Sequence, residues 1–199
     1  MRAKDRGRNP EMNRRITAAV AAIVGLGLTI GVAGTATAAK PKPRKGEIRI
    51  TGGPFFVPGK RIGDDVRFNL NSTIKSGGTM KVVNNGDPAA GPHTISLLKQ
   101  SALPRTQAQA EPCFEFQGVC APLVTAHQVN PETQEPAVIE YNAGAPGFDT
   151  MGDDKTAGDS LFIAPGQKRV SFKVTARKGS KLSYFCAVHP WMQGKITVK

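Results

Sequence analysis

The sequence contains little histidine, cysteine and tryptophan, and these shortages limit the functions it can have. Its 199 residues include three His, three Cys and one Trp, which allows one mononuclear transition-metal site but not the further sites that a multinuclear oxidase needs. The motifs Gly-x-Ser-x-Gly, His-Glu-x-x-His and Gly-x-x-x-x-Gly-Lys are absent as well. We therefore expect a protein that is not an enzyme.

Basic residues exceed acidic ones, yet no aromatic-basic motif typical of RNA- or DNA-binding domains accompanies them, and we expect no nucleic-acid partner. The formal net charge of the whole chain is +12. Removing residues 1–38 takes six Lys/Arg and two Asp/Glu from the totals of 27 and 15, which leaves +8. A charge of this size favours a partner that is acidic at its docking face.

The first 38 residues have the features of a secretory signal. A basic segment ends at Arg14 and Arg15, an uncharged run follows over 16–39, and Ala36-Thr37-Ala38 is typical of a cleavage site. We expect 1–38 to be a signal peptide and the mature protein to be exported to the medium, cell envelope or periplasm. The run is also long enough to remain as a membrane anchor, and the twin arginine leaves folded-state export open.

A single domain over 47–199 follows a basic linker, 39–46, whose Lys, Arg and Pro residues cannot form a core. Short segments of alternating apolar residues, separated by Gly, Pro, Asn and Asp, predict an all-β sandwich. Between 99 and 160 the alternation is lost in a Pro-rich stretch, which predicts an irregular insertion with short helices near 106–111, or one packed as a functional lobe. The alternating positions are Ile48 and Ile50; Val66, Phe68 and Leu70; Met80 and Val82; Ile95 and Leu97; Val170, Phe172 and Val174; Leu182, Tyr184 and Cys186; Ile196 and Val198.

Four residues form a candidate metal site. Cys186, His189 and Met192 follow one another at three-residue steps after an alternating strand, and Pro190 argues against a helix there. A turn over 187–193 therefore holds these side chains, and His93 begins a second strand that can supply the fourth. Such donors are typical of electron-transferring copper, because soft sulfur suits Cu(I) and imidazole suits both oxidation states.

With these residues in place, the sequence resembles the cupredoxins, the type 1 blue copper proteins. The Cys-x2-His-x2-Met loop is most similar to that of amicyanin, followed by plastocyanin, and the resemblance covers about 47–98 and 161–199. In that family Asn often follows the first His and steadies the cysteine loop, whereas this sequence has Thr94 there. The resemblance implies a Greek-key β-sandwich that holds one copper through His93, Cys186, His189 and Met192.

The resemblance also implies a function, the transfer of single electrons to and from a redox partner protein. In the family the C-terminal His of the site is commonly the exposed one, so we expect electrons to pass through His189 while Trp191 helps to dock the partner. Burial of Trp191 in the core is the alternative. Two other functions stay open: copper delivery, and an interaction domain in which copper is incidental.

The two remaining cysteines lie in the insertion. Cys113 and Cys120 are seven residues apart, and a disulfide between them suits an exported protein and leaves Cys186 free to bind metal. Their alternative role is as soft-metal ligands together with His127. Otherwise we expect His127 to be an exposed loop residue.

Overall fold

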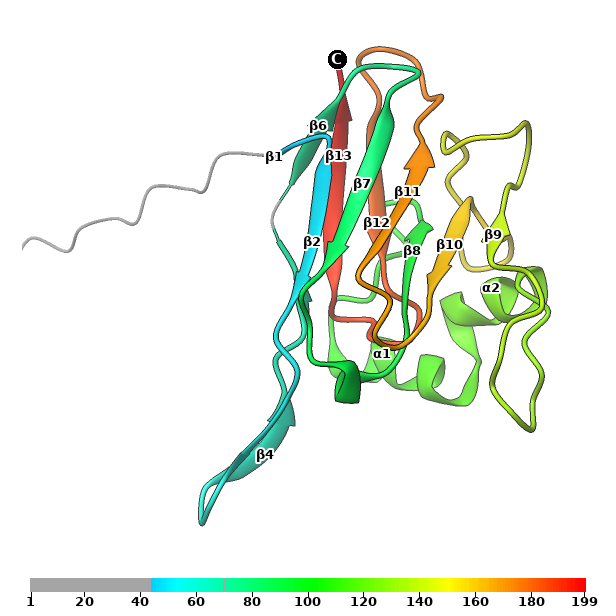
Figure 1. Ribbon diagram of the computed structural model, residues 1–199. Coiled ribbons are helices and arrows are strands. Elements are labelled where there is room, and N and C mark those ends of the chain that lie inside the picture. The colour runs from blue at the N-terminus through cyan, green and yellow to red at the C-terminus, as the bar shows by residue number, and fades with distance from the viewer. Residues whose placement is uncertain (1–43, 70) are drawn as a thin grey trace, which may run out of the picture. The chain divides into compact units, whose positions relative to one another are not determined.

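Two β-sheets pack face to face in this protein (Figure 1). The computed structural model describes residues 44–69 and 71–199; the predicted signal peptide 1–38 and the first part of the predicted linker lie outside the described residues. In spatial order, the larger sheet contains β1 (Arg44–Lys45), β6 (Ser72–Ile74), β13 (Gln193–Val198), β12 (Lys181–Phe185), β8 (His93–Leu97), β10 (Ser160–Ile163) and β9 (Glu140–Tyr141). The smaller sheet contains β11 (Arg169–Lys173), β7 (Thr79–Asn84), β2 (Glu47–Thr51) and β5 (Arg67–Phe68).

The main apolar core lies between the two sheets. Buried and more exposed residues alternate along β2 and β7, as the period-two pattern predicts. Phe68 of the smaller sheet meets Tyr184 of the larger one edge-on, with ring centroids 5.0 Å apart. Position 194, paired with Tyr184, requires glycine, because a Cβ there would lie 2.4 Å from the Tyr184 ring. The predicted all-β sandwich is confirmed.

The predicted insertion forms a lobe of short helices beside the larger sheet (Figure 1). Its first helix begins after Thr106, whose hydroxyl accepts a hydrogen bond from the Gln109 amide, so the predicted helices near 106–111 are present. A second, smaller apolar core joins the lobe to Phe185 of β12. The helices are α1 (Gln107–Ala110), η2 (Glu111–Glu115), η3 (Gly118–Cys120) and α2 (Ala121–Ala126).

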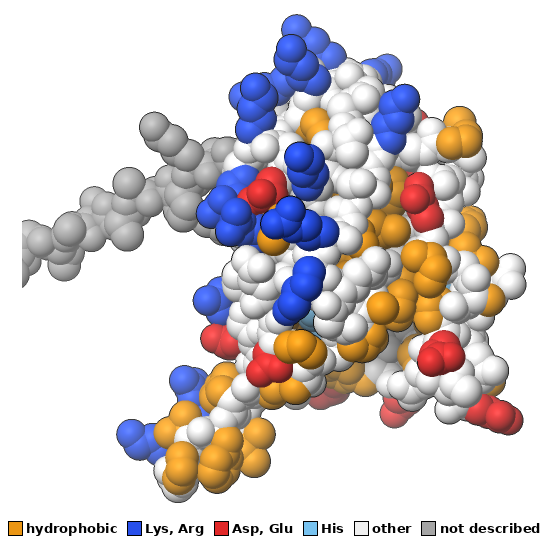
Figure 2. All heavy atoms as spheres, viewed as in Figure 1, with side chains coloured by type: hydrophobic (Ala, Val, Ile, Leu, Met, Phe, Trp, Pro, Cys, Tyr) orange, Lys and Arg blue, Asp and Glu red, His pale blue; other side chains and the backbone are white. Residues whose placement is uncertain are grey.

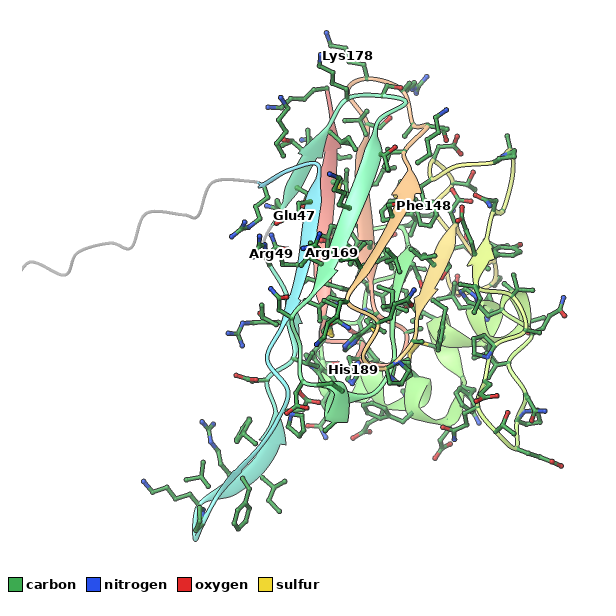
Figure 3. The ribbon with its side chains drawn as sticks, viewed as in Figure 1. Glu47, Arg49, Phe148, Arg169, Lys178 and His189 are labelled. Atoms are coloured by element: carbon green, nitrogen blue, oxygen red, sulfur yellow. A yellow bond between two sulfur atoms is a disulfide. The ribbon has the colours of Figure 1, made fainter. Side chains whose placement is uncertain are left out.

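The C-terminal part of the insertion is fixed to the main core. Phe148 is fully buried and its ring centroid lies 4.1 Å from that of Phe172 (Figure 3). The buried Asp159 carboxylate accepts hydrogen bonds from three backbone amides, at 2.6 to 2.8 Å. A buried carboxylate needs such donors in place of water. The donors are the amides of Ala143, Asp149 and Thr150.

Of the described strands, six lie outside the alternating segments that the sequence predicts, among them the short strands β6 and β9. β10 begins at the last residue of the predicted insertion and lies between β8 and β9. Because it is covered by its neighbours, its sequence lacks the alternation of apolar and polar residues that indicates a strand. A hairpin of β3 (Pro54–Val57) and β4 (Arg61–Asp64) projects from the sandwich (Figure 1) and has no core to impose an alternation. Arg44–Lys45, near the end of the predicted linker, form the strand β1, which pairs with β6. No helix within the described ranges has the length and hydropathy to cross a membrane.

Candidate metal centre

The metal centre is built where β8 begins and β12 ends. β8 and β12 are antiparallel neighbours, so His93 at the start of one strand comes to lie beside Cys186 after the end of the other. The chain then turns back into β13. Two backbone hydrogen bonds close this turn, from the Cys186 amide to the Met192 carbonyl at 3.0 Å and from the Met192 amide to the His189 carbonyl at 2.8 Å. The predicted turn over 187–193 is therefore confirmed.

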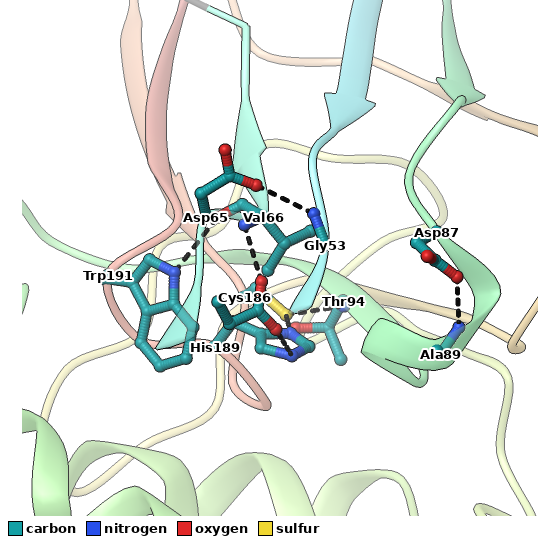
Figure 4. A network of polar contacts seen from close by, with 10 residues as sticks. Gly53, Asp65, Val66, Asp87, Ala89, Thr94, Cys186, His189 and Trp191 are labelled. Carbon is teal, nitrogen blue, oxygen red and sulfur yellow. Dashed lines mark hydrogen bonds and ion pairs between the residues drawn. The ribbon is translucent and has the colours of Figure 1, made fainter. Parts of the chain in front are cut away.

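Three of the four predicted ligands converge. Donor atoms of His93, Cys186 and His189 all lie within 4.8 Å of one another, and Cys186 Sγ is 3.6 Å from His189 Nδ1 (Figure 4). The side chains are buried, with 1%, 0% and 6% of their surfaces exposed. Among residues 44–69 and 71–199, no other group of three His, Cys, Asp or Glu side chains is close enough to hold a metal ion.

Met192, the fourth predicted ligand, is buried in the main core, in contact with the metal-binding loop through its backbone. Its hydrogen bond to His189 places it in the same turn as two of the other donors. Its role as a weak axial ligand stays a prediction.

Thr94 stands at the position where the resembled family often has Asn, and it holds the cysteine loop in place. Its backbone N–H donates to Cys186 Sγ at 3.3 Å (Figure 4). Its hydroxyl accepts from the Ala187 N–H at 2.8 Å. Both contacts tie the residue next to one ligand, His93, to the strand end that carries another. Hydrogen bonds of this kind orient ligands and tune a metal site.

Burial controls the protonation of the donors. It lowers the pKa of His93 to about 4, and the neighbouring His189 adds to this shift. It also lowers the pKa of His189, against the opposing effect of the Asp64 carboxylate, whose Oδ2 lies 4.0 Å from Nε2. Both imidazoles are therefore neutral and able to bind metal at neutral pH. Burial raises the pKa of the Cys186 thiol, so metal binding has to displace its proton.

The donor set fits copper. Nδ1 of His93 is buried and has no hydrogen-bond partner among the described residues, although a buried polar atom is normally satisfied. This nitrogen, Cys186 Sγ and His189 Nδ1 are the atoms that a shared metal ion would engage. Two imidazoles with one thiolate are the trigonal set typical of electron-transferring copper.

Trp191 lies at the surface beside the centre. It is 46% exposed, and its indole N–H donates to the Val66 carbonyl at 3.0 Å (Figure 4). Its ring meets that of His189 edge-on at 5.2 Å, so a surface aromatic residue contacts the buried imidazole. The exposed Phe114 of the insertion is next to it, with ring centroids 6.3 Å apart. The structure thus favours a surface position of Trp191 over burial in the core.

The expectation for His127 is wrong, because this residue is buried and 3% exposed. It follows α2, four residues after the buried Leu123, and residues four apart share a helix face. That spacing was the available signal. Its ring makes hydrogen bonds to the Val138 carbonyl at 2.5 Å and to the Ser160 hydroxyl at 2.7 Å. Burial lowers its pKa.

The predicted disulfide is present. Cys113 and Cys120 are bonded to each other, and Cys186 is the free cysteine. Since both sulfur atoms of the insertion are used in this bond, the alternative of a second soft-metal site with His127 does not hold.

Comparisons with known proteins give structural neighbours only. No protein-family model and no curated protein matches the chain. A purple cupredoxin from Nitrosopumilus maritimus is similar at 16% identity and a TM-score of 0.36, over 77% of this chain and 98% of that one. Auracyanin A, a "blue" copper protein from Chloroflexus aurantiacus, is similar at 19% identity and a TM-score of 0.36, over 79% and 100%.

Amicyanin in a reduced Cu(I) form is similar at 14% identity and a TM-score of 0.33, over 76% of this chain and 98% of that one. These three neighbours belong to the cupredoxins, the family that the sequence resembles. Because the TM-scores are below 0.5, the function is argued from this chain's own donor atoms.

Proposed function

We propose that the protein is an exported carrier of single electrons that holds one copper ion between His93, Cys186 and His189, with Met192 as a weak axial ligand. The observation that carries this proposal is the convergence of two imidazoles and one thiol in a buried cluster, with donor atoms within 4.8 Å of one another. When bound there, copper supplies a one-electron couple between Cu(II) and Cu(I).

The chain's contribution is a frame that changes little between the two oxidation states. The turn is closed by its own backbone hydrogen bonds, and the Thr94 amide donates to the sulfur at 3.3 Å. Gln193, the last residue of the turn, donates through its side chain to the Pro104 and Pro190 carbonyls, at 2.6 and 2.9 Å. Ligands held in this way need little rearrangement when an electron arrives or leaves.

The electron exit that we propose runs through His189 to the surface at Trp191. His189 Nδ1 faces Cys186, and the edge of its ring contacts the exposed indole. Beside Trp191 lies a cleft of about 650 Å³ whose lining includes Arg105, Phe114 and Pro190. Aromatic residues next to an Arg are typical of protein-docking surfaces, and Arg105 suits a redox partner that is acidic at its docking face.

Burial of the donors favours this function over copper delivery. A metal cargo has to leave for another protein, yet all three donor side chains are buried. An exchange of metal would require the turn to open. Resident copper requires no such opening, and the same turn can exclude water from the ion.

Electron paramagnetic resonance of the copper-loaded protein tests the proposal. A thiolate-bound type 1 site is expected to give a small copper hyperfine splitting, and Cys186→Ser, which keeps the side-chain size, is expected to abolish it. Reversible one-electron cycling, without loss of metal, is the second expected result. A large splitting, typical of ordinary tetragonal Cu(II), would count against the carrier function, and loss of copper on reduction would favour delivery.

A further inference from the structure

A chain of buried hydrogen bonds connects the insertion to the cysteine loop. It begins at His127 Nε2, which is 2.7 Å from Ser160 Oγ. Ser160 Oγ is 2.7 Å from Ser96 Oγ, and Ser96 Oγ is 2.9 Å from Thr94 Oγ1. The chain ends where Thr94 Oγ1 accepts the Ala187 N–H. These five residues are called the relay below.

His127 is held in one orientation at the start of the relay. The Val138 carbonyl, 2.5 Å from Nδ1, can only accept, so Nδ1 carries the hydrogen. In the neutral ring Nε2 is then the acceptor for the Ser160 hydroxyl. Ser96 is therefore the donor in both of its contacts, and its one proton is shared between Ser160 Oγ and Thr94 Oγ1. The side chains of His127, Ser160, Ser96 and Thr94 are all buried, where water is not at hand to replace a lost partner.

The insertion touches the same loop at further points. The Cys120 sulfur lies 3.5 Å from the Ala187 carbonyl oxygen, and Phe185, which precedes the ligand Cys186, is buried in the core that the insertion supplies. Ala187 is therefore fixed by the insertion on one side and by Thr94 on the other. Without the relay, the Thr94 hydroxyl would be free to rotate away from the Ala187 amide.

We infer that His127 is a positioning residue, which through the relay keeps the loop at Cys186 in its metal-binding conformation. The insertion is then a brace for the metal centre. The effect on bound copper rests on the proposed function, whereas the effect on the Ala187 amide does not. The hydrogen bonds of the His127 ring go to Val138 and Ser160 and not to a predicted ligand, so it acts on the loop through Ser160, Ser96 and Thr94.

Amide hydrogen exchange in the metal-free protein gives the direct test. His127→Ala is expected to speed exchange of the Ala187 amide about three- to tenfold, the effect of one lost hydrogen bond. His127→Gln, which offers an acceptor to Ser160, is expected to restore most of the protection. The matched control is Leu123→Ala, which removes volume from α2 and from the small core around Phe185 but leaves the relay intact.

Two results would overturn this inference: unchanged protection of Ala187 in His127→Ala, or an equal loss of protection in Leu123→Ala at equal overall stability. With copper bound, only His127→Ala is expected to shift the visible band and reduction potential. If exchange changes as expected but no variant binds copper in a type 1 site, the relay stands and the proposed function fails.

Independently, basic side chains gather at the end of the sandwich opposite the metal centre (Figure 2). Lys178 and His189 mark the two ends (Figure 3). Backbone hydrogen bonds from Gly77 to Val174 and from Gly179 to Val198 join the loops there. Within the described ranges, none of the six exposed cations there forms an ion pair. The six, called the basic pole, are Lys45, Lys75, Arg177, Lys178, Lys181 and Lys199.

We propose that the basic pole lies against an anionic bilayer surface. Lys and Arg side chains near such a surface each add to the attraction. Lys40 and Lys42 continue the basic run immediately before β1, and the uncharged run 16–39 directly precedes them in the sequence. Where that run is kept as a membrane anchor and not cleaved, the basic residues next to it are held near a bilayer, which favours a bilayer over an acidic protein. Bound in this way, the domain presents its metal centre away from the membrane.

Sedimentation with lipid vesicles tests the basic pole. Vesicles with about one third anionic lipid are expected to bind the protein in low salt and release it in high salt. Lys75→Glu/Lys178→Glu is expected to weaken binding at least about 25-fold, at roughly fivefold per cation. The control is Lys60→Glu/Arg61→Glu on the β3–β4 hairpin, which has the same net charge as Lys75→Glu/Lys178→Glu. The control is expected to bind the vesicles more tightly than the double variant of the basic pole.

Equal weakening in both double variants would overturn the proposal, because binding would then follow net charge and not a face. Equal binding to neutral vesicles would assign the affinity to the uncharged run 16–39. Binding to polyglutamate without binding to anionic vesicles would replace the bilayer by an acidic protein.

Discussion

Replacing Thr94 by Val removes one buried hydroxyl and keeps the branched shape that suits β8. In the wild-type protein this oxygen accepts the Ala187 N–H at 2.8 Å and is 2.9 Å from Ser96 Oγ. The variant leaves the Ala187 amide without its acceptor, whereas Ser96 keeps its contact with Ser160. An unsatisfied buried donor costs about 1–3 kcal/mol. We expect the free energy of unfolding of the metal-free protein to fall by about 2 kcal/mol, within this range.

Urea denaturation, followed by fluorescence of the single tryptophan, measures this change. The dependence of the unfolding free energy on urea concentration is expected to stay the same, since the surface exposed on unfolding is unchanged. Thr94→Ser keeps a hydroxyl and serves as the control, with a loss of less than about 1 kcal/mol. A Thr94→Val protein within about 0.5 kcal/mol of wild type, the range of ordinary surface substitutions, would refute the reasoning.

Three further predictions concern buried polar groups. Asp159→Asn replaces one acceptor oxygen by a donor against three backbone amides, so the free energy of unfolding is expected to fall by about 1–3 kcal/mol; an unchanged urea midpoint would contradict this. The Tyr184 hydroxyl is buried without a partner among the described residues, so Tyr184→Phe is expected to raise the thermal midpoint or leave it unchanged, and a clear fall would show that the hydroxyl is satisfied. Burial lowers the pKa of His127 below its usual 6.5, so folding favours the neutral ring. The resulting contribution to the free energy of unfolding is complete above about pH 6.5 and is lost as the pH falls through the pKa of the folded state. The stability of the wild type is therefore expected to decrease more steeply than that of His127→Gln between pH 7 and pH 5, and parallel urea midpoints would rule out this assignment.

Most strands of the main core were predictable because they have one buried face. Ile48 and Ile50 in β2, or Met80 and Val82 in β7, alternate with more exposed neighbours, and that alternation is a local property of the sequence. β10 lacked such a signal because the insertion and the neighbouring strands cover it. The β3–β4 hairpin lacked it for the opposite reason, since Phe56 and Ile62 are 68% and 79% exposed.

The donor set was also accessible from sequence, because three of its members share one turn and their spacing is local. The surroundings of His127 were not, although its four-residue spacing from the buried Leu123 was a local signal of burial. Its partners Val138 and Ser160 come from different parts of the insertion and leave no periodic trace. The contribution of Thr94 was visible only as a departure from the resembled family, and the structure shows the bond that it makes.

Titration of Cu(II) into the thiol-reduced protein, followed by visible absorption, is the most direct test of the central claim that Cys186, His93 and His189 share one metal ion. An intense thiolate charge-transfer band is expected to grow up to one equivalent and then stop. The same titration of Cys186→Ser is expected to give no such band. A wild-type solution that stays colourless, or a band of equal strength in Cys186→Ser, would contradict the claim.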